Sequence, residues 1–219
     1  MHLAHKKLFL ALTGIILILL IIFITQFGKT LNIVVKKSTT PLLTPGSYEI
    51  AIAPEDPVLG NPGAPLTFVE FIDLAEAPDL KLHRTLYDFV ALHPKATRLV
   101  WKDLPKAHLL KGSADTAHRA AWCSGRQGKF WNFINAVADH KISALSKSFK
   151  SIGLELKIDQ AKFDACLNDI TFPNQIGASA GLAARLGLGR GPALFVNNKE
   201  LDLSQEVDFE TLLKSLIIE

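Results

Sequence analysis

The sequence offers little for binding a metal ion or for redox chemistry. Its 219 residues include two cysteines, one methionine and two tyrosines. The spacing of Cys123 and Cys166 fits no zinc-binding pattern, and no cluster of further ligands accompanies them. No cysteine precedes position 123. We therefore predict neither a bound metal nor any other cofactor, and the cysteines are either two buried thiols or one disulfide.

Acidic residues are absent from the first 40 positions, which hold five lysines. The rest of the chain has 19 of the 24 basic residues against all 21 acidic residues, although the whole chain has a net charge of +3. A domain that binds nucleic acid is expected to carry a basic patch. The slightly negative balance outside the N-terminal stretch argues against a nucleic-acid-binding protein.

An uncharged stretch of 20 residues, from Leu8 to Phe27, is rich in Ile, Leu and Phe. A helix of this length rises about 30 Å, the thickness of the hydrocarbon core of a bilayer. A cleaved signal would have a shorter apolar core and a small-residue cleavage site. We therefore predict that residues 1–28 are an uncleaved anchor in the lipid bilayer. The short N-terminal tail favours a single-pass protein of the cell membrane whose C-terminal domain is periplasmic or extracellular.

Behind the anchor, residues 29–53 are expected to form a linker, and a weak alternation at 47–53 is compatible with an edge strand. The folded domain is expected over residues 54–219. Its elements should follow in the order strand, helix, strand, helical block, hairpin and helix, at residues 66–72, 80–91, 98–104, 112–188, 194–203 and 209–217. The near-continuous apolar run of the first strand predicts a sheet that is covered on both faces. This order indicates an α/β fold.

Two acids, Glu76 and Asp79, lie where the first strand runs into the first helix. Free backbone N–H groups and the positive end of the helix dipole meet at such a junction. The acids are compatible with three roles. They can stabilise the helix dipole, they can bind a basic or hydrogen-bonding partner in a groove, or they can hold a metal ion together with Asp73 and His83.

Several sequence blocks resemble the DsbA-like thiol-disulfide oxidoreductases. The blocks are residues 56–65 before the first strand, 71–73 at its end, 118–131 and 163–167 in the helical block, and 191–197 at the hairpin. The resemblance covers about residues 54–217. It implies a thioredoxin fold with a helical insertion at about residues 112–188.

The resemblance also implies a Cys-x-x-Cys at the start of the first helix, where the helix dipole makes the first thiol nucleophilic. In this chain the four positions read Glu76-Ala77-Pro78-Asp79. Disulfide exchange is therefore not expected at this site. His83 falls where the family often has a histidine without a metal, which argues against a metal site.

Pro192 corresponds to the cis-proline of the family, in a loop that abuts the active-site helix and can pair with an extended peptide. The preceding residue is Gly191, where the family usually has Thr or Val. We expect Gly191, Pro192, Glu76 and Asp79 to line a peptide- or partner-binding site. The alternative is that Pro192 only shapes the turn into the strand.

Cys123 and Cys166 both lie in the expected helical insertion, and an even pair outside the cytoplasm predicts a structural disulfide. The prediction for the whole chain is a membrane-anchored, extracytoplasmic DsbA-like protein without the redox dithiol, serving as a binding, chaperone-like or scaffold module for a protein or peptide. One alternative is an enzyme with Glu76 and Asp79 as acid/base groups. Another is a thiol-disulfide oxidoreductase that acts through Cys123 and Cys166.

The remaining aromatic and histidine residues of the insertion receive structural interpretations. Helical spacing predicts a core position for Trp122, Phe130, Trp131 and Phe133. His118 and His140 are isolated in the sequence and are expected to be satisfied core residues or surface residues.

Overall fold

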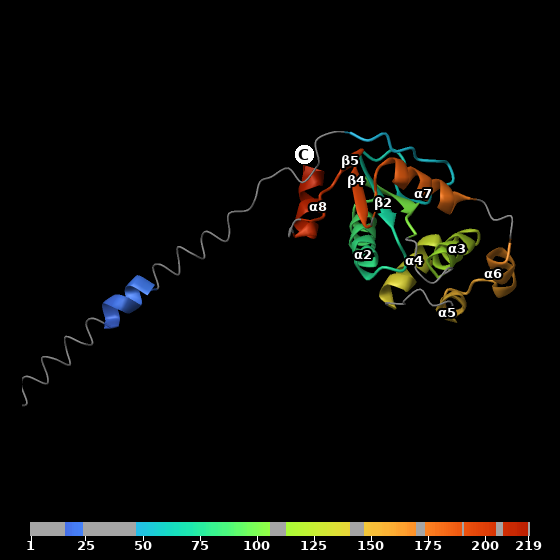
Figure 1. Cartoon of the computed structure of the whole chain (residues 1–219), viewed down its shortest axis with the longest axis horizontal. Helices are drawn as coiled ribbons and strands as arrows, with labels where there is room; N and C mark the ends of the chain where they lie inside the picture. The colour runs from blue at the N-terminus through green and yellow to red at the C-terminus, as the bar shows by residue number, and fades with distance from the viewer. Residues whose placement is uncertain are drawn as a thin grey trace, which may run out of the picture. The chain divides into compact units, whose positions relative to one another are not determined.

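The computed structural model describes residues 16–23, 47–105, 113–140, 147–169, 174–189, 191–204 and 208–218 (Figure 1). Its contacts divide the chain into two units, Met1–Pro41 and Leu42–Glu219. In the first unit, residues 16–23 form a helix whose apolar side chains are all exposed. No helix within the described ranges is long and apolar enough to cross a membrane. Most of the predicted anchor and the linker up to residue 46 lie outside the described residues.

The second unit is built on one five-stranded sheet in the order β1-β3-β2-β4-β5. The strands are β1 Val58–Gly60, β2 Leu66–Ile72, β3 Thr97–Asp103, β4 Ala193–Val196 and β5 Lys199–Glu200. Strands β2 and β3 are parallel, whereas the other pairs are antiparallel. In the parallel pair Ile72 is opposite Asp103, so both strands end at the same end of the sheet.

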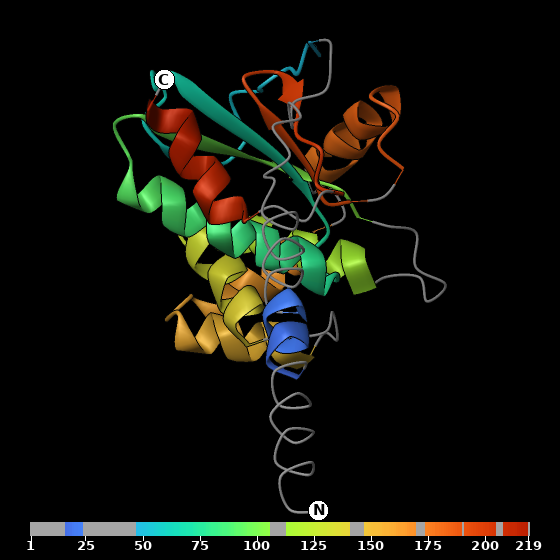
Figure 2. The ribbon, with the colours of Figure 1, turned by 90° about the vertical axis from the view of Figure 1, so that its left-hand side faces the viewer.

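Eight helices are described, of which seven belong to the second unit. These are α2 Ala77–Leu92, α3 Ser113–Gly125, α4 Phe130–Asp139, α5 Lys147–Glu155, α6 Gln160–Leu167, α7 Gln175–Arg185 and α8 Phe209–Ile218. Helices α2 and α8 cover one face of the sheet and α7 covers the other, as Figures 1 and 2 show. The sheet is therefore covered on both faces, as the sequence predicts.

Helices α3 to α6 form a separate apolar cluster at the end of the sheet (Figure 1). Ile72, Leu74 and Trp101 connect this cluster to the ends of β2 and β3. The helical insertion expected between the second strand and the hairpin is thus present. Within it, Asp159 caps α6, because its carboxylate accepts the Lys162 N–H at 3.1 Å.

The hairpin of β4 and β5 turns at Asn197 and Asn198, whose φ angles of 47° and 66° are typical of a tight two-residue turn. The interpretation of residues 47–53 as a possible edge strand is wrong, because the structure has no strand there. That segment makes one backbone bond to the turn, from the Tyr48 N–H to the Asn198 carbonyl, instead of a ladder. The edge strand next to β3 is instead β1, which lies between that segment and β2.

Candidate functional site

The two acids at the start of α2 occupy different environments. Glu76 is the N-cap residue of α2 and is half-buried, and its side chain makes no capping hydrogen bond. Asp79 is fully buried. Its Oδ2 accepts the backbone N–H of Asp73 at 2.9 Å, which ties the first turn of α2 to the residue after β2. Asp79 is therefore a structural anchor at the positive end of the helix, where a negative charge is stabilised.

The loop before β4 packs against this anchor. The Gly191–Pro192 peptide bond is cis, as predicted. A Cβ atom at position 191 would lie 2.7 Å from Oδ2 of Asp79 and 3.2 Å from a methyl group of Leu104. Only glycine fits this position without movement of a neighbour. The sequence departs from the family at both 79 and 191, and the structure places the two departures in contact.

A buried histidine lies beneath the junction. Nδ1 of His118, on α3, is 2.6 Å from Oδ1 of Asp103 and donates to it. Nε2 of the same ring lies 3.6 Å from Oδ1 of Asp73 and 3.3 Å from the Leu74 amide nitrogen. The protonated ring donates to Asp73, whereas the neutral ring accepts the Leu74 N–H. All three side chains of this Asp–His–Asp group are fully buried.

The charge of His118 follows from its partners. Complete burial lowers the pKa of the ring. The hydrogen bonds to Asp103 and Asp73 and the negative charges of these carboxylates outweigh this effect and raise the pKa from 6.5 to about 9. The ring is therefore a cation at neutral pH. Trp101 and Trp122 donate their indole N–H groups to the two oxygens of Asp103, at 2.9 and 2.8 Å. The expectation of a satisfied histidine is confirmed for His118.

His83 pairs with Glu70 and not with Asp73, Glu76 or Asp79, the acids considered with it as metal ligands. Nδ1 of His83 lies 2.8 Å from Oε1 of Glu70, and both side chains are fully buried. Within the described ranges, no three His, Cys, Asp or Glu residues are arranged to hold a metal ion. The metal alternative with Asp73, Glu76, Asp79 and His83 is therefore not supported by the geometry.

An open groove lies beside the cis-proline. It has a volume of about 250 Å³ and is bounded by the first turns of α2, the Pro192 loop, the segment after β5, and α8. Most of its walls are apolar, formed by Pro78, Leu82, Pro192, Leu201, Leu203, Phe209 and Leu212. Lys81, Thr85 and Asp202 supply the polar part. Of the four predicted binding residues, only Pro192 lines this groove. Gly191 and Asp79 pack against each other, and Glu76 is the N-cap residue of the adjoining helix α2.

Asp103 and most of the groove residues are not among the residues predicted from the sequence. Asp103 ends a strand that runs parallel to β2, and the ends of adjacent parallel strands meet, so its position held a usable signal. The groove residues that follow β5 and those of α8 held none, because only tertiary packing brings them to Pro192.

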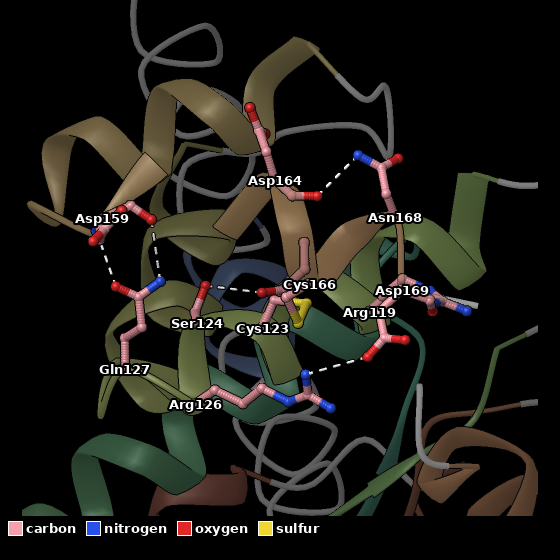
Figure 3. Close-up of a disulfide and its surroundings, with 11 residues drawn as sticks. Arg119, Cys123, Ser124, Arg126, Gln127, Asp159, Asp164, Cys166, Asn168 and Asp169 are labelled. Carbon is pink, nitrogen blue, oxygen red and sulfur yellow. Dashed lines mark hydrogen bonds and ion pairs between the residues drawn. A yellow bond between two sulfur atoms is a disulfide. The ribbon is translucent and has the colours of Figure 1, made fainter. Parts of the chain in front are cut away.

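The two cysteines form a disulfide that joins α3 to α6, with a Cα–Cα distance of 5.7 Å. Both residues are buried. Figure 3 shows the disulfide together with Gln127 and Asp159 of the same insertion. The Asp159 N–H donates to the side-chain oxygen of Gln127 at 2.9 Å, and the side-chain amide of Gln127 donates to the Asp159 carbonyl at 3.2 Å. The disulfide prediction is confirmed, and the bond lies within the helical insertion rather than at the junction.

The chain is similar in structure to several solved proteins. A thioredoxin-like oxidoreductase from Silicibacter pomeroyi DSS-3 superposes with a TM-score of 0.64 and 26% identity, covering 76% of this chain and 92% of the other. The thiol-disulfide exchange protein α-DsbA2 of Wolbachia pipientis has a TM-score of 0.61 and 18% identity, with 74% and 87% covered. A periplasmic thioredoxin-like protein from Salmonella enterica serovar Typhimurium has a TM-score of 0.58 and 19% identity, with 75% and 91% covered.

Sequence comparison adds one relative, and no family model matches the chain. The relative is the Na⁺/H⁺ antiporter NhaA 1 of Mycolicibacterium gilvum (strain PYR-GCK), which is 30% identical over 152 residues. These are 68% of this chain and 24% of the antiporter, so the chain spans about a quarter of that protein's length. The fold, the cis-proline, the helical insertion and the structural relatives agree. The chain therefore has the thioredoxin-like fold with a helical insertion that these DsbA-like structures share, and Glu76 and Asp79 stand where the sequence resemblance places the two thiols.

Proposed function

We propose that this chain is a membrane-anchored, extracytoplasmic DsbA-like protein that binds an apolar polypeptide segment beside Pro192 without thiol chemistry. The observation that carries the proposal is the open, largely apolar groove between the start of α2, the cis-proline loop and α8. A groove filled by the protein's own side chains would have indicated a structural relic. An open groove is available to a ligand.

The chemistry of the groove favours an apolar segment with few charges. Its apolar walls bury hydrocarbon surface favourably, and a few polar groups at the edge are enough to orient a ligand. Lys81 and Asp202 provide one positive and one negative group, so the groove selects neither sign of charge strongly. The cis-proline loop next to it carries backbone groups that can pair with an extended chain.

Loss of thiol exchange is supported by the residues at the junction. A carboxylate cannot form a mixed disulfide, and both positions of the dithiol carry one. The alternative of acid/base catalysis by Glu76 and Asp79 is less well supported, because Asp79 is fully buried. Redox work by Cys123 and Cys166 is also less well supported, because both are buried inside the insertion.

Three observations support the membrane setting. The uncharged run from Leu8 to Phe27 is long enough to cross a bilayer, and its described part is a helix of exposed apolar side chains. A disulfide is typical of an oxidising compartment outside the cytoplasm. One structural relative is described as periplasmic, and the sequence relative is an ion antiporter.

The test measures binding and thiol chemistry on the same sample, the full-length protein in maltoside micelles. Its probe is reduced, carboxymethylated lactalbumin, an unfolded polypeptide with no free thiol. We expect saturable binding of the probe and no catalysed reduction of insulin. Leu203→Glu places a charge at the apolar edge of the groove and should weaken binding about tenfold or more.

The matched control is Leu154→Glu, the same substitution at an exposed leucine of α5 outside the groove. It should bind the probe as the unaltered protein does. Equal binding by the Leu203 and Leu154 variants would refute the groove as the binding site. Catalysed insulin reduction that is lost on Cys123→Ser would instead establish the redox alternative.

A further inference from the structure

A second and larger cavity, of about 460 Å³, lies away from the peptide groove. It is bounded by the loop before β1, the α3–α4 junction and the first residue of α7, and it shares no lining residue with the groove. Its volume falls in the range of small-molecule sites, about 300–1,000 Å³. The proposed peptide binding makes no use of it.

Three aromatic rings form one side of this cavity. They belong to Trp122 at the end of α3 and to Phe130 and Trp131 at the start of α4. The Phe130 ring meets both indoles edge to face, at centroid distances of 5.6 Å for Trp122 and 5.3 Å for Trp131. The sequence analysis placed all three in the core. Only Phe130 is buried, whereas the two indoles are half-exposed at the cavity.

Each of the two indoles contacts a buried side chain that holds it in position. The Trp122 N–H donates to Oδ2 of Asp103 at 2.8 Å. The Trp131 ring stacks on the buried ring of His83, with the planes 4° from parallel and the centroids 5.9 Å apart. Rings that are fixed before a ligand arrives lose little conformational freedom on binding, which favours affinity.

The charges around the cavity leave a negative balance. Arg126 faces Asp169, with 3.7 Å between Nη1 and Oδ2, so its charge is offset. Glu55 also lines the cavity, and it makes no ion pair or side-chain hydrogen bond with any residue that the structure describes. The cavity therefore presents aromatic rings, the carboxylate of Glu55 and the guanidinium of Arg126, whose charge Asp169 offsets in part.

The loop that carries Glu55 is anchored through the two residues that follow it. The carboxylate of Asp56 lies 2.5 Å from Nζ of Lys102 and 2.6 Å from the Ala53 amide nitrogen, which donates to it. The Pro57 carbonyl accepts the Trp101 N–H at 3.0 Å. The loop that carries Glu55 is thus tied to β3 on its C-terminal side.

We propose that this cavity binds an organic cation, with the positive group against the aromatic rings and near Glu55. A cation is attracted to the face of an aromatic ring within about 6 Å of its centroid, and the indole of Trp is the strongest of the three ring types. The cavity is larger than a lone ammonium group, so the ligand carries a further body. Both a choline headgroup and the guanidinium of an arginine side chain have this chemistry.

The experiment titrates three small probes into the full-length protein in a maltoside detergent, which itself carries no cation. Choline and N-acetylarginine amide represent the two sources of the cation. The third probe, 3,3-dimethylbutanol, has the shape of choline without its charge. Binding is followed by calorimetry and by the indole N–H resonances of the three tryptophans. Trp101 is an internal reference, because it is fully buried and does not line the cavity.

We expect at least one cation to shift the resonances of Trp122 and Trp131 saturably, and the neutral probe to bind at least about tenfold more weakly. Glu55→Gln should weaken cation binding about threefold, and Trp131→Leu about fivefold or more. Glu49→Gln, at an exposed acid of the same segment outside the cavity, should have no effect. Equal binding of choline and its neutral analogue, or no shift with either cation, would overturn the proposal. An unchanged affinity in Glu55→Gln would overturn the role of that carboxylate.

Discussion

The carboxylate of Asp79 lies in the space that a side chain at position 191 would need. Its Oδ2 is 2.7 Å from the place of a Cβ on Gly191, and a bond of 2.9 Å from the Asp73 N–H holds it there. The resemblance to the DsbA-like proteins places a thiol at position 79 and Thr or Val at position 191. In this chain Asp79 and Gly191 occupy these positions, and Oδ2 of Asp79 fills the space beside the glycine.

Gly191→Ala tests this packing directly. The new methyl group would be too close to Oδ2 of Asp79 and would lie 3.2 Å from a methyl of Leu104. We expect a loss of about 1–3 kcal/mol in the free energy of unfolding, measured by denaturant titration. Gly189→Ala is the matched control, because a Cβ there meets no atom within 4 Å. It should change stability by less than about 0.5 kcal/mol.

A double-mutant cycle tests the coupling between the two positions. Asp79→Ala alone leaves the Asp73 N–H without this buried acceptor and should destabilise the protein by about 1–3 kcal/mol. In the double variant the methyl group of residue 191 no longer meets the carboxylate, so the combined loss should be smaller than the sum by about 1 kcal/mol. Strictly additive losses would show that the contact has no energetic importance.

The Asp–His–Asp group predicts a dependence of stability on pH. The pKa of His118 is about 9 in the folded state against an ordinary value of 6.5. Because the folded-state pKa is the higher one, the stabilisation is fully present below about pH 6.5 and is lost as the pH rises through about 9. The free energy of unfolding should fall by about 3 kcal/mol over this window. Denaturant titrations at a series of pH values measure it.

Two histidine variants separate this contribution from others. His118→Gln should remove most of the slope between about pH 6.5 and 9. His140→Gln should keep the slope, because His140 is exposed and pairs with Glu155 at the surface. A stability that is flat across the window in the unaltered protein would contradict the charged state of His118.

The disulfide predicts a stabilisation of the helical insertion. Cys123 and Cys166 are 43 residues apart, and a cross-link of this separation contributes about 2–4 kcal/mol, chiefly by restricting the unfolded chain. Cys123→Ala with Cys166→Ala should lower the free energy of unfolding by about this amount. The unaltered protein should show no reactive thiol until it is unfolded and reduced. Two reactive thiols in the native protein would rule the disulfide out.

Local sequence signals were sufficient for most of the fold. The apolar run of β2 and the hairpin at residues 194–203 depend on contacts over a few residues, and both are present in the structure. The edge strand was misplaced because alternation at residues 47–53 says nothing about which segment reaches β3. That choice depends on pairing with residues about 40 positions away, in the register of Val58 with Val100.

The site was predictable only in part. The junction and the cis-proline follow from blocks that are contiguous in the sequence. The buried state of Asp79 does not, because an acid in a first helical turn is usually exposed, and only its bond to Asp73 and its contact with the 191 loop account for burial. The same holds for Trp122 and Trp131, whose helical spacing is that of core residues although each has one side at a cavity.

The junction should regain thiol chemistry if its thiols are restored. Glu76→Cys with Asp79→Cys places a half-buried thiol at the N-cap of α2 and a second, buried one a turn later. The helix dipole lowers the pKa of the first thiol, and the second can resolve a mixed disulfide. We expect catalysed insulin reduction in the double variant and none in the unaltered protein. Glu76→Cys alone is the control, because a single thiol can attack a disulfide but has no resolving partner at the junction. A folded double variant with two titratable thiols and no turnover would show that the groove no longer presents a substrate to this position.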